Sequence, residues 1–121
     1  MNSSVDPWTP HSIARSEGTL DRVAFWNMNN RMDEGPAKMA MERILQAVAP
    51  DIIGFSEVSN VSANYVRGLL NEWVPLEGGA SWNVVKDDYD LMVASKGAVL
   101  SSHSGVYRQF PVVVQAHDDW L

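Results

Sequence analysis

The chain has 121 residues, of which 45% are apolar, with no cysteine and a formal net charge of −6. This length allows one domain with a modest core, and the lack of cysteine excludes disulfides, zinc–thiolate sites and a cysteine nucleophile. Because no run of Lys or Arg occurs, strong nonspecific binding of duplex nucleic acid is disfavoured. No apolar stretch approaches the roughly 20 residues that span a bilayer.

Residues 1–20 are polar and contain Pro7, Pro10 and Gly18, which predicts a flexible N-terminal arm. The arm has no positively charged segment followed by an apolar one, so no signal peptide is evident and a cytoplasmic location is slightly favoured. The next residues, 21–26, are an almost continuous apolar run, which predicts a strand covered on both faces of its sheet.

Two helices are predicted from apolar residues that recur at i, i+3, i+4 and i+7. The first begins near Pro36, which suits the first turn of a helix, and Pro50 ends it. The second spans about 62–73, with Ser62 or Asn60 as its N-cap. The apolar faces are Met41, Ile44, Leu45 and Val48 in the first helix and Val66, Leu69, Leu70 and Trp73 in the second.

Between the helices, Asp51 to Phe55 is a second apolar strand, which makes the start of the chain strand–helix–strand–helix. After residue 81, short apolar runs alternate with turn residues, and this pattern predicts strands that close as an antiparallel meander. These runs are 82–86, 91–95, 98–101 and 112–116. We therefore expect the α/β class, with a mixed sheet of the α+β kind.

Three polar side chains follow the two predicted strands. Asn27 and Asn29 follow the first strand, and Glu57 follows the second. Strand–helix–strand connections usually make the two strands parallel, so both end at the edge of the sheet where ligands of α/β folds bind. One carboxylate with amide oxygens can form half of a Mg²⁺ site, because water molecules and a substrate phosphate complete the coordination shell of this ion. Such a site supports phosphoester hydrolysis. From spacing alone, the simpler alternative is that Glu57 is a solvated loop residue.

Residues 22–29 read RVAFWNMN and residues 49–58 read APDIIGFSEV, with one predicted helix between them. These segments resemble the two opening motifs of the endonuclease/exonuclease/phosphatase superfamily, which are written TWN-N and D-I-hydrophobic-hydrophobic-Q-E. Residues 107–114, YRQFPVVV, are similar to the R-x-P-F strand of its deoxyribonuclease-I-like branch. Together the three segments span nearly all of the predicted ordered chain.

By this resemblance, Glu57 is the metal-binding glutamate and Asn27 is the active-site asparagine that contacts metal or phosphate, so both are expected to be catalytic. Asn29 falls where some members place an Asp or Asn near the metal. The expected cofactor is Mg²⁺, with Mn²⁺ or Ca²⁺ as alternatives. The sequence departs from the motif at Ser56, where the family usually has a Gln that supports the site without binding the metal.

The family's catalytic His, its Asp-x-Asn motif and its C-terminal Asp-His pair follow the R-x-P-F strand and have no counterpart in this sequence. The resemblance therefore implies the N-terminal half of a four-layer α/β/β/α sandwich, with residues 21–121 as a partial domain. We expect a portion of a metal-dependent hydrolase of phosphodiesters or phosphomonoesters, with little turnover by itself. The substrate stays open between a nucleic acid and a phosphorylated small molecule or lipid.

Other residues offer weaker candidates for chemistry. His117 precedes Asp118 and Asp119 and could bind metal or act as a base, although a solvated tail is the simpler interpretation. His103 lies in a Ser-rich loop without a nucleophile elbow, which disfavours a serine hydrolase. The acidic stretch 87–90 matches only part of a calcium loop and is interpreted as a turn.

A second function that fits the sequence is a non-catalytic interaction module that keeps half of the fold. An open sheet without its second layer exposes apolar area and strand edges, which favours association with a partner or with another copy. This alternative predicts self-association through the exposed sheet, whereas the hydrolase interpretation predicts that a divalent metal binds at Glu57.

Overall fold

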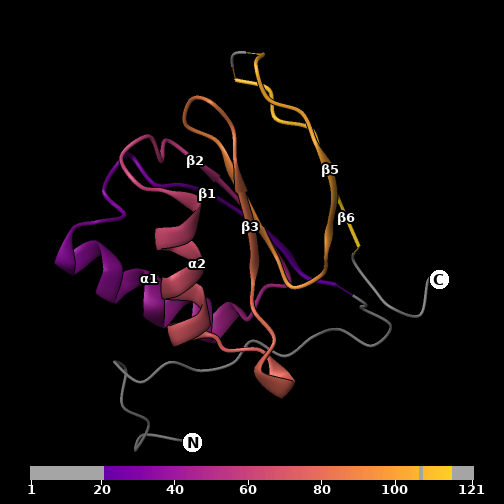
Figure 1. The fold of residues 1–121 in the computed structure, drawn as a ribbon. Coiled ribbons are helices and arrows are strands. Elements are labelled where there is room, and N and C mark those ends of the chain that lie inside the picture. Colours follow the sequence, from indigo (N-terminus) through magenta and orange to yellow (C-terminus); the bar gives the residue numbers. More distant parts are fainter. Residues whose placement is uncertain (1–20, 107, 116–121) are drawn as a thin grey trace, which may run out of the picture.

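The computed structural model describes residues 21–106 and 108–115, which form a mixed α+β fold (Figure 1). Four strands make one mixed sheet in the order β1-β2-β4-β3, and two more make a separate ribbon, β5-β6. The arm predicted over 1–20 lies outside the described residues. Neither helix in the described part is long and apolar enough to cross a membrane. The elements are β1 (Val23–Asn27), α1 (Gly35–Val48), β2 (Ile52–Ser56), α2 (Ala63–Trp73), the short 3₁₀ helix η1 (Glu77–Gly79), β3 (Asn83–Lys86), β4 (Met92–Ser95), β5 (Val99–Ser102) and β6 (Val112–Val114).

The first three elements form the predicted parallel strand–helix–strand unit. β1 pairs with β2 in parallel, and the register places Asn27 opposite Ser56. Pro36 lies in the first turn of α1, where its missing N–H costs no hydrogen bond. The helix is capped at Ala49, whose left-handed backbone (φ 48°) lets its N–H donate to a carbonyl of the last helical turn. The chain then turns directly into β2.

Both helices contribute to the core, but α1 does so through a narrower face than predicted. At the start of α2, the Ser62 hydroxyl accepts a hydrogen bond from the N–H of Tyr65 (3.0 Å), which confirms the predicted N-cap. Ile44 was predicted to lie on the apolar face of α1, yet it is 44% exposed because no described element covers that flank of the helix. The buried helix residues are Met41 and Leu45 in α1 and Val66, Leu70 and Trp73 in α2.

The prediction of an antiparallel meander is confirmed within the β3-β4 and β5-β6 pairs but is wrong between β4 and β5, which belong to different sheets. β3 and β4 form a hairpin, but β4 pairs antiparallel with β2, so β3 is left at the edge of the sheet. The residues explain this order, because Met92 and Ala94 of β4 are buried, whereas β3 carries Asn83 and Lys86, which suit an edge strand. β5 and β6 pair with each other in a ribbon separate from this sheet.

The two faces of the four-stranded sheet differ in what covers them. α1 and α2 lie on one face, and the β5-β6 ribbon stands off the other (Figure 1). On this second face, Val23 and Phe25 of β1 are 50% and 86% exposed, so the prediction of a strand covered on both faces is wrong within the described residues. We call this surface the open face. It is formed by Val23, Phe25, Gly54 and Val93.

Asp51 joins the starts of β1 and β2 to the end of β4. Its carboxylate accepts a hydrogen bond from the backbone N–H of Arg22 (2.7 Å) and forms an ion pair with the ammonium group of Lys96 (3.1 Å). Its backbone carbonyl also accepts from the N–H of Lys96 (3.0 Å). Asp51 therefore has a structural role, whereas Glu57 lies at the opposite end of the same strand.

Gly97 lies in the turn before β5, close to the main chain that follows β6. A Cβ at this position would lie 1.6 Å from the carbonyl oxygen of Gln115. We expect Gly97→Ala to lower the free energy of unfolding by about 1–3 kcal/mol, because main chain rather than a flexible side chain must move. Urea unfolding monitored by circular dichroism measures this change.

Gly68→Ala is the matched control for this prediction. Gly68 lies within α2, and open space surrounds the position that a Cβ would occupy. Alanine favours the helix over glycine, so this variant should raise the free energy of unfolding by roughly 0.5–1 kcal/mol. Equal stabilities of the two variants would contradict the close contact at Gly97.

Candidate functional site

A polar pocket of about 210 Å³ lies at the carboxyl ends of β1 and β2. It brings together two residues that the sequence predicts for the site, Asn27 and Glu57, and adds the charged residues Asp90 and Arg108. The complete lining is Asn27, Ser56, Glu57, Asp90, Leu91 and Arg108. Two carboxylates, one guanidinium and one amide therefore share one small pocket.

The parallel pairing of β1 and β2 is what places Asn27 beside Glu57. The pairing continues past both strands, since the N–H of Met28 donates to the carbonyl of Ser56 (2.9 Å) and the N–H of Asn30 donates to the carbonyl of Glu57 (2.7 Å). Glu57 is half-buried and has a left-handed backbone (φ 54°). This conformation is unfavourable in free energy for any residue that has a Cβ atom. Strained backbone of this kind is often found at functional sites.

Side-chain hydrogen bonds fix the two loops that leave this edge of the sheet. The side-chain oxygen of Asn30 accepts from both the N–H (3.0 Å) and the hydroxyl (2.9 Å) of Ser59. The Asn60 amide donates to the carbonyl of Asn30 (2.9 Å) and to the carboxylate of Asp33 (2.8 Å). These bonds join the loop after β1 to the loop after β2 and so restrain the position of Glu57.

Asn29 follows Asn27 but does not line the pocket. It is exposed, with a left-handed backbone (φ 51°), and its N–H donates to the side-chain oxygen of Asn27 (2.9 Å). This turn orients the Asn27 amide, so Asn29 supports the pocket through its backbone. The structure brings Asn27 and Glu57 together without bringing in the Asn29 side chain.

Asp90 reaches the pocket because β4 runs antiparallel to β2, so the residues before β4 lie beside the residues after β2. The carbonyl of Asp90 accepts a hydrogen bond from the N–H of Val58 (3.1 Å), which fixes this proximity. Buried Asp87 shapes the same loop, since one of its carboxylate oxygens accepts from the N–H groups of Tyr89 and Leu91 (both 2.9 Å). The predicted turn at 87–90 therefore also supplies an acid to the pocket.

Arg108 enters the pocket from the segment that precedes β6. It has a left-handed backbone (φ 62°) within a short turn in which the N–H of Gln109 donates to the carbonyl of Val106 (3.0 Å). The sequence alone did not predict Arg108 or Asp90 as residues of the site. The signal for Arg108 is its place in the R-x-P-F-like segment, and the signal for Asp90 is the acidic stretch 87–90, which was interpreted as a turn.

The carboxylates that line this pocket could hold a hard divalent cation that keeps part of its water shell. Mg²⁺ is commonly bound through one or two protein carboxylates, and Glu57 and Asp90 provide two. Over residues 21–106 and 108–115, no group of three or more acidic or histidine side chains is placed to hold a metal. His103 is exposed in the loop after β5, and His11 and His117 lie outside the described residues.

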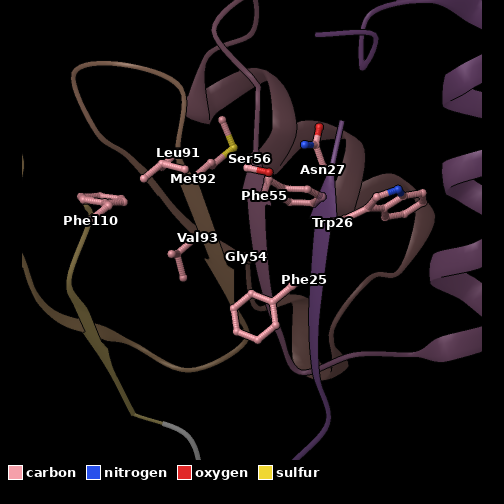
Figure 2. Close-up of a pocket in the computed structure, with 10 residues that line it drawn as sticks. All are labelled: Phe25, Trp26, Asn27, Gly54, Phe55, Ser56, Leu91, Met92, Val93 and Phe110. Carbon is pink, nitrogen blue, oxygen red and sulfur yellow. The ribbon is translucent and has the colours of Figure 1, made fainter. Parts of the chain in front are cut away.

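An apolar groove of about 390 Å³ adjoins the polar pocket and shares Asn27, Ser56 and Leu91 with it. The groove runs over the open face of the sheet. Figure 2 shows Phe25 and Val93 on this face, with Phe110 facing them from the segment before β6. The remaining lining residues are Trp26, Gly54, Phe55 and Met92. A charged site and an uncharged surface thus lie next to each other.

No family model matches the sequence, and no curated protein or solved structure is significantly similar to it. The residues of the pocket and of the groove are therefore the basis for assigning a function. Of these residues, all three charged ones, Glu57, Asp90 and Arg108, line the pocket and none lines the groove.

Proposed function

We propose that this chain provides the metal-binding part of a Mg²⁺-dependent phosphoesterase of the endonuclease/exonuclease/phosphatase type, as the N-terminal half of a four-layer α/β/β/α sandwich. The observation that supports this most is that Asn27, Glu57, Asp90 and Arg108 line one pocket at the carboxyl ends of parallel strands. Ligand sites of α/β folds occur at this edge. The mixed sheet with both helices on one face is consistent with one half of such a sandwich.

Each of these side chains has a role in binding a phosphate ester. Glu57 and Asp90 would hold Mg²⁺ through carboxylate oxygens. When bound, the ion would polarise the phosphoryl group and stabilise charge that develops on its oxygens. Arg108 has the planar charged group that pairs with phosphate oxygens in a bidentate manner, and the NH₂ group of Asn27 would donate to another oxygen.

No histidine lines the pocket among the described residues, and histidine is the side chain most often used to activate water at neutral pH. We therefore expect the chain to bind metal and phosphate ester with little or no turnover by itself. These side chains would contact only the phosphate group, so they do not select one class of phosphate ester. Phosphodiesters and phosphomonoesters both remain within the proposal.

Metal binding at Glu57 is the direct test of this function. We expect Mg²⁺ to raise the thermal unfolding midpoint of the wild-type chain in a saturable way, with about 1.4 kcal/mol of stabilisation when Mg²⁺ is at ten times its Kd. Glu57→Gln should abolish this response, because it removes the charge while keeping the shape of the side chain. Isothermal titration calorimetry with Mg²⁺ and Mn²⁺ gives a second measure of the same loss.

Glu77→Gln is the matched control for the metal-binding test. Glu77 is an exposed glutamate in η1 and does not line the pocket, so its variant should respond to Mg²⁺ as the wild type does. If Glu57→Gln and Glu77→Gln bind Mg²⁺ equally well, Glu57 is not a ligand and the proposed function is wrong.

A non-catalytic interaction module is the second candidate function, and a different observation favours it. Phe25 is 86% exposed on a sheet face that the described residues leave largely uncovered. Exposed apolar patches of this kind mark interaction sites in soluble proteins. This function does not require a metal, so the Mg²⁺ titration separates the two candidates.

A further inference from the structure

We propose that Asn30, which does not line the polar pocket, is a positioning residue that holds Glu57 in place so that the pocket selects Mg²⁺ over Ca²⁺. This inference rests on the proposed function, because it takes Glu57 as a metal ligand, and it adds the residue that sets the choice of cation. Three features support it: the hydrogen bonds of Asn30, the backbone of Glu57, and the small number of carboxylates in the pocket.

Asn30 holds the residues that follow β2 through three of its own polar groups. Its N–H donates to the carbonyl of Glu57 (2.7 Å), and its carbonyl accepts from the side-chain amide of Asn60 (2.9 Å). Its side-chain oxygen accepts from both the N–H (3.0 Å) and the hydroxyl (2.9 Å) of Ser59. One residue of the loop after β1 is therefore bonded to three of the four residues 57–60.

The loop after β1 gives Asn30 a fixed position from which to do this. Its backbone is left-handed (φ 53°), a conformation that asparagine adopts more readily than most residues with a Cβ. The N–H of Arg31 donates to the carbonyl of Met28 (3.0 Å), which closes the turn around Asn30. Met28 and Met32, on either side of this turn, are both buried in the core. The turn is thus anchored, and its bonds hold the second loop to it.

Glu57 needs this restraint because its left-handed backbone (φ 54°) is locally unfavourable for a residue with a Cβ. A return to an extended or right-handed backbone would turn its side chain away from the pocket. The bonds from Asn30 oppose that change, since they act on Glu57 itself and on two residues just after it. The second acid, Asp90, is tied to the same loop, because its carbonyl accepts from the N–H of Val58 (3.1 Å).

Fixed carboxylates that are few in number favour Mg²⁺. This ion requires near-octahedral geometry and keeps several water molecules, whereas Ca²⁺ takes about 6–8 oxygen ligands in a flexible arrangement. The pocket supplies two carboxylates, Glu57 and Asp90, and the described part of the chain has no group of three or more acidic or histidine side chains placed to hold a metal. Because Mg²⁺ depends more on fixed geometry, freeing Glu57 should weaken Mg²⁺ binding more than Ca²⁺ binding.

Isothermal titration calorimetry with Mg²⁺ and with Ca²⁺ tests this selectivity. Asn30→Gly removes the side-chain oxygen but still permits the left-handed backbone and its bonds to Glu57 and Asn60. We expect this variant to raise the Kd for Mg²⁺ about tenfold and the Kd for Ca²⁺ only about twofold. Ser59→Ala removes one of the two donors to Asn30, so it should raise the Kd for Mg²⁺ less, about threefold.

Asn64→Gly is the matched control. It makes the same substitution at an exposed residue of α2 that does not line the pocket, so both Kd values should equal those of the wild type. Asn30 and Ser59 are also exposed, so their variants should keep a thermal unfolding midpoint close to that of the wild type. A tenfold change in Mg²⁺ affinity in a folded variant then reports positioning and not a loss of stability.

The outcomes separate this inference from the proposed function. If Glu57→Gln loses Mg²⁺ binding while Asn30→Gly binds Mg²⁺ as the wild type does, the role of Asn30 is wrong and the metal site stands. Equal weakening of Mg²⁺ and Ca²⁺ by Asn30→Gly, or a wild-type chain that prefers Ca²⁺, overturns the selectivity and leaves Glu57 as a ligand. A wild-type chain that binds neither cation overturns both.

Discussion

Trp82→Ala is expected to lower the free energy of unfolding by about 3–5 kcal/mol, which is among the largest effects that a single substitution has in a core. Trp82 is 1% exposed, directly precedes β3 and belongs to the hydrophobic core that also contains Leu70 of α2. Its indole N–H donates to the carbonyl of Val74 (2.9 Å), and its backbone N–H donates to the side chain of Asn71 (2.9 Å). Truncation removes the apolar contacts and also removes the donor that the Val74 carbonyl has in the wild type.

Urea unfolding measures this loss, and Trp82→Phe separates its two causes. Phenylalanine keeps most of the apolar volume but cannot donate to Val74, so we expect this variant to lose about 1–3 kcal/mol. The difference between the free energies of unfolding of the two variants then gives the cost of the cavity that alanine leaves. A loss of less than 1 kcal/mol for Trp82→Ala would show that the tryptophan does not hold α2 on the sheet.

Asp87→Ala is expected to lower the free energy of unfolding by about 2–4 kcal/mol and to weaken the response to Mg²⁺. Asp87 is only 6% exposed, and one of its oxygens accepts hydrogen bonds from two backbone N–H groups of the β3-β4 loop. Without this acceptor, both N–H groups lose their partner, and the loop that carries Asp90 to the pocket loses its shape. A residue outside the pocket would thus change metal binding through the position of Asp90.

Two neighbouring variants test this interpretation. Asp87→Asn keeps an acceptor oxygen, so it should recover most of the lost stability and of the Mg²⁺ response. Asp88→Ala removes the adjacent carboxylate, which is exposed, and should change the free energy of unfolding by no more than about 0.5 kcal/mol. If Asp87→Ala were as stable as Asp88→Ala, the two hydrogen bonds would have no measurable role.

The sequence predicted the first half of the fold well because local rules decide it. Pro36, Pro50 and the hydroxyl of Ser62 set the helix ends, and the spacing of apolar residues sets the buried faces apart from the exposed Ile44. The parallel pairing of β1 and β2 also follows from the single helix between them. Which strand of the β3-β4 hairpin would join β2 could not be predicted, because that choice depends on contacts between residues about 40 positions apart along the chain.

The same limit explains which site residues were missed. Asn27 and Glu57 each follow a predicted strand, so strand direction alone brings them to one edge. Asp90 reaches them only because β4, and not β3, pairs with β2. Arg108 approaches across a separate ribbon, and no local pattern predicts where that ribbon lies. The candidate metal ligands were therefore half predictable from the sequence.

The left-handed backbone of Glu57 has a consequence for how this position can change under mutation. Glycine adopts φ near 54° freely, whereas glutamate pays about 1 kcal/mol or more for it. Replacement by glycine would then relieve strain and remove the carboxylate in one step. A population of variants selected only for folding would drift away from glutamate here, and only selection for the chemistry of the pocket would retain it.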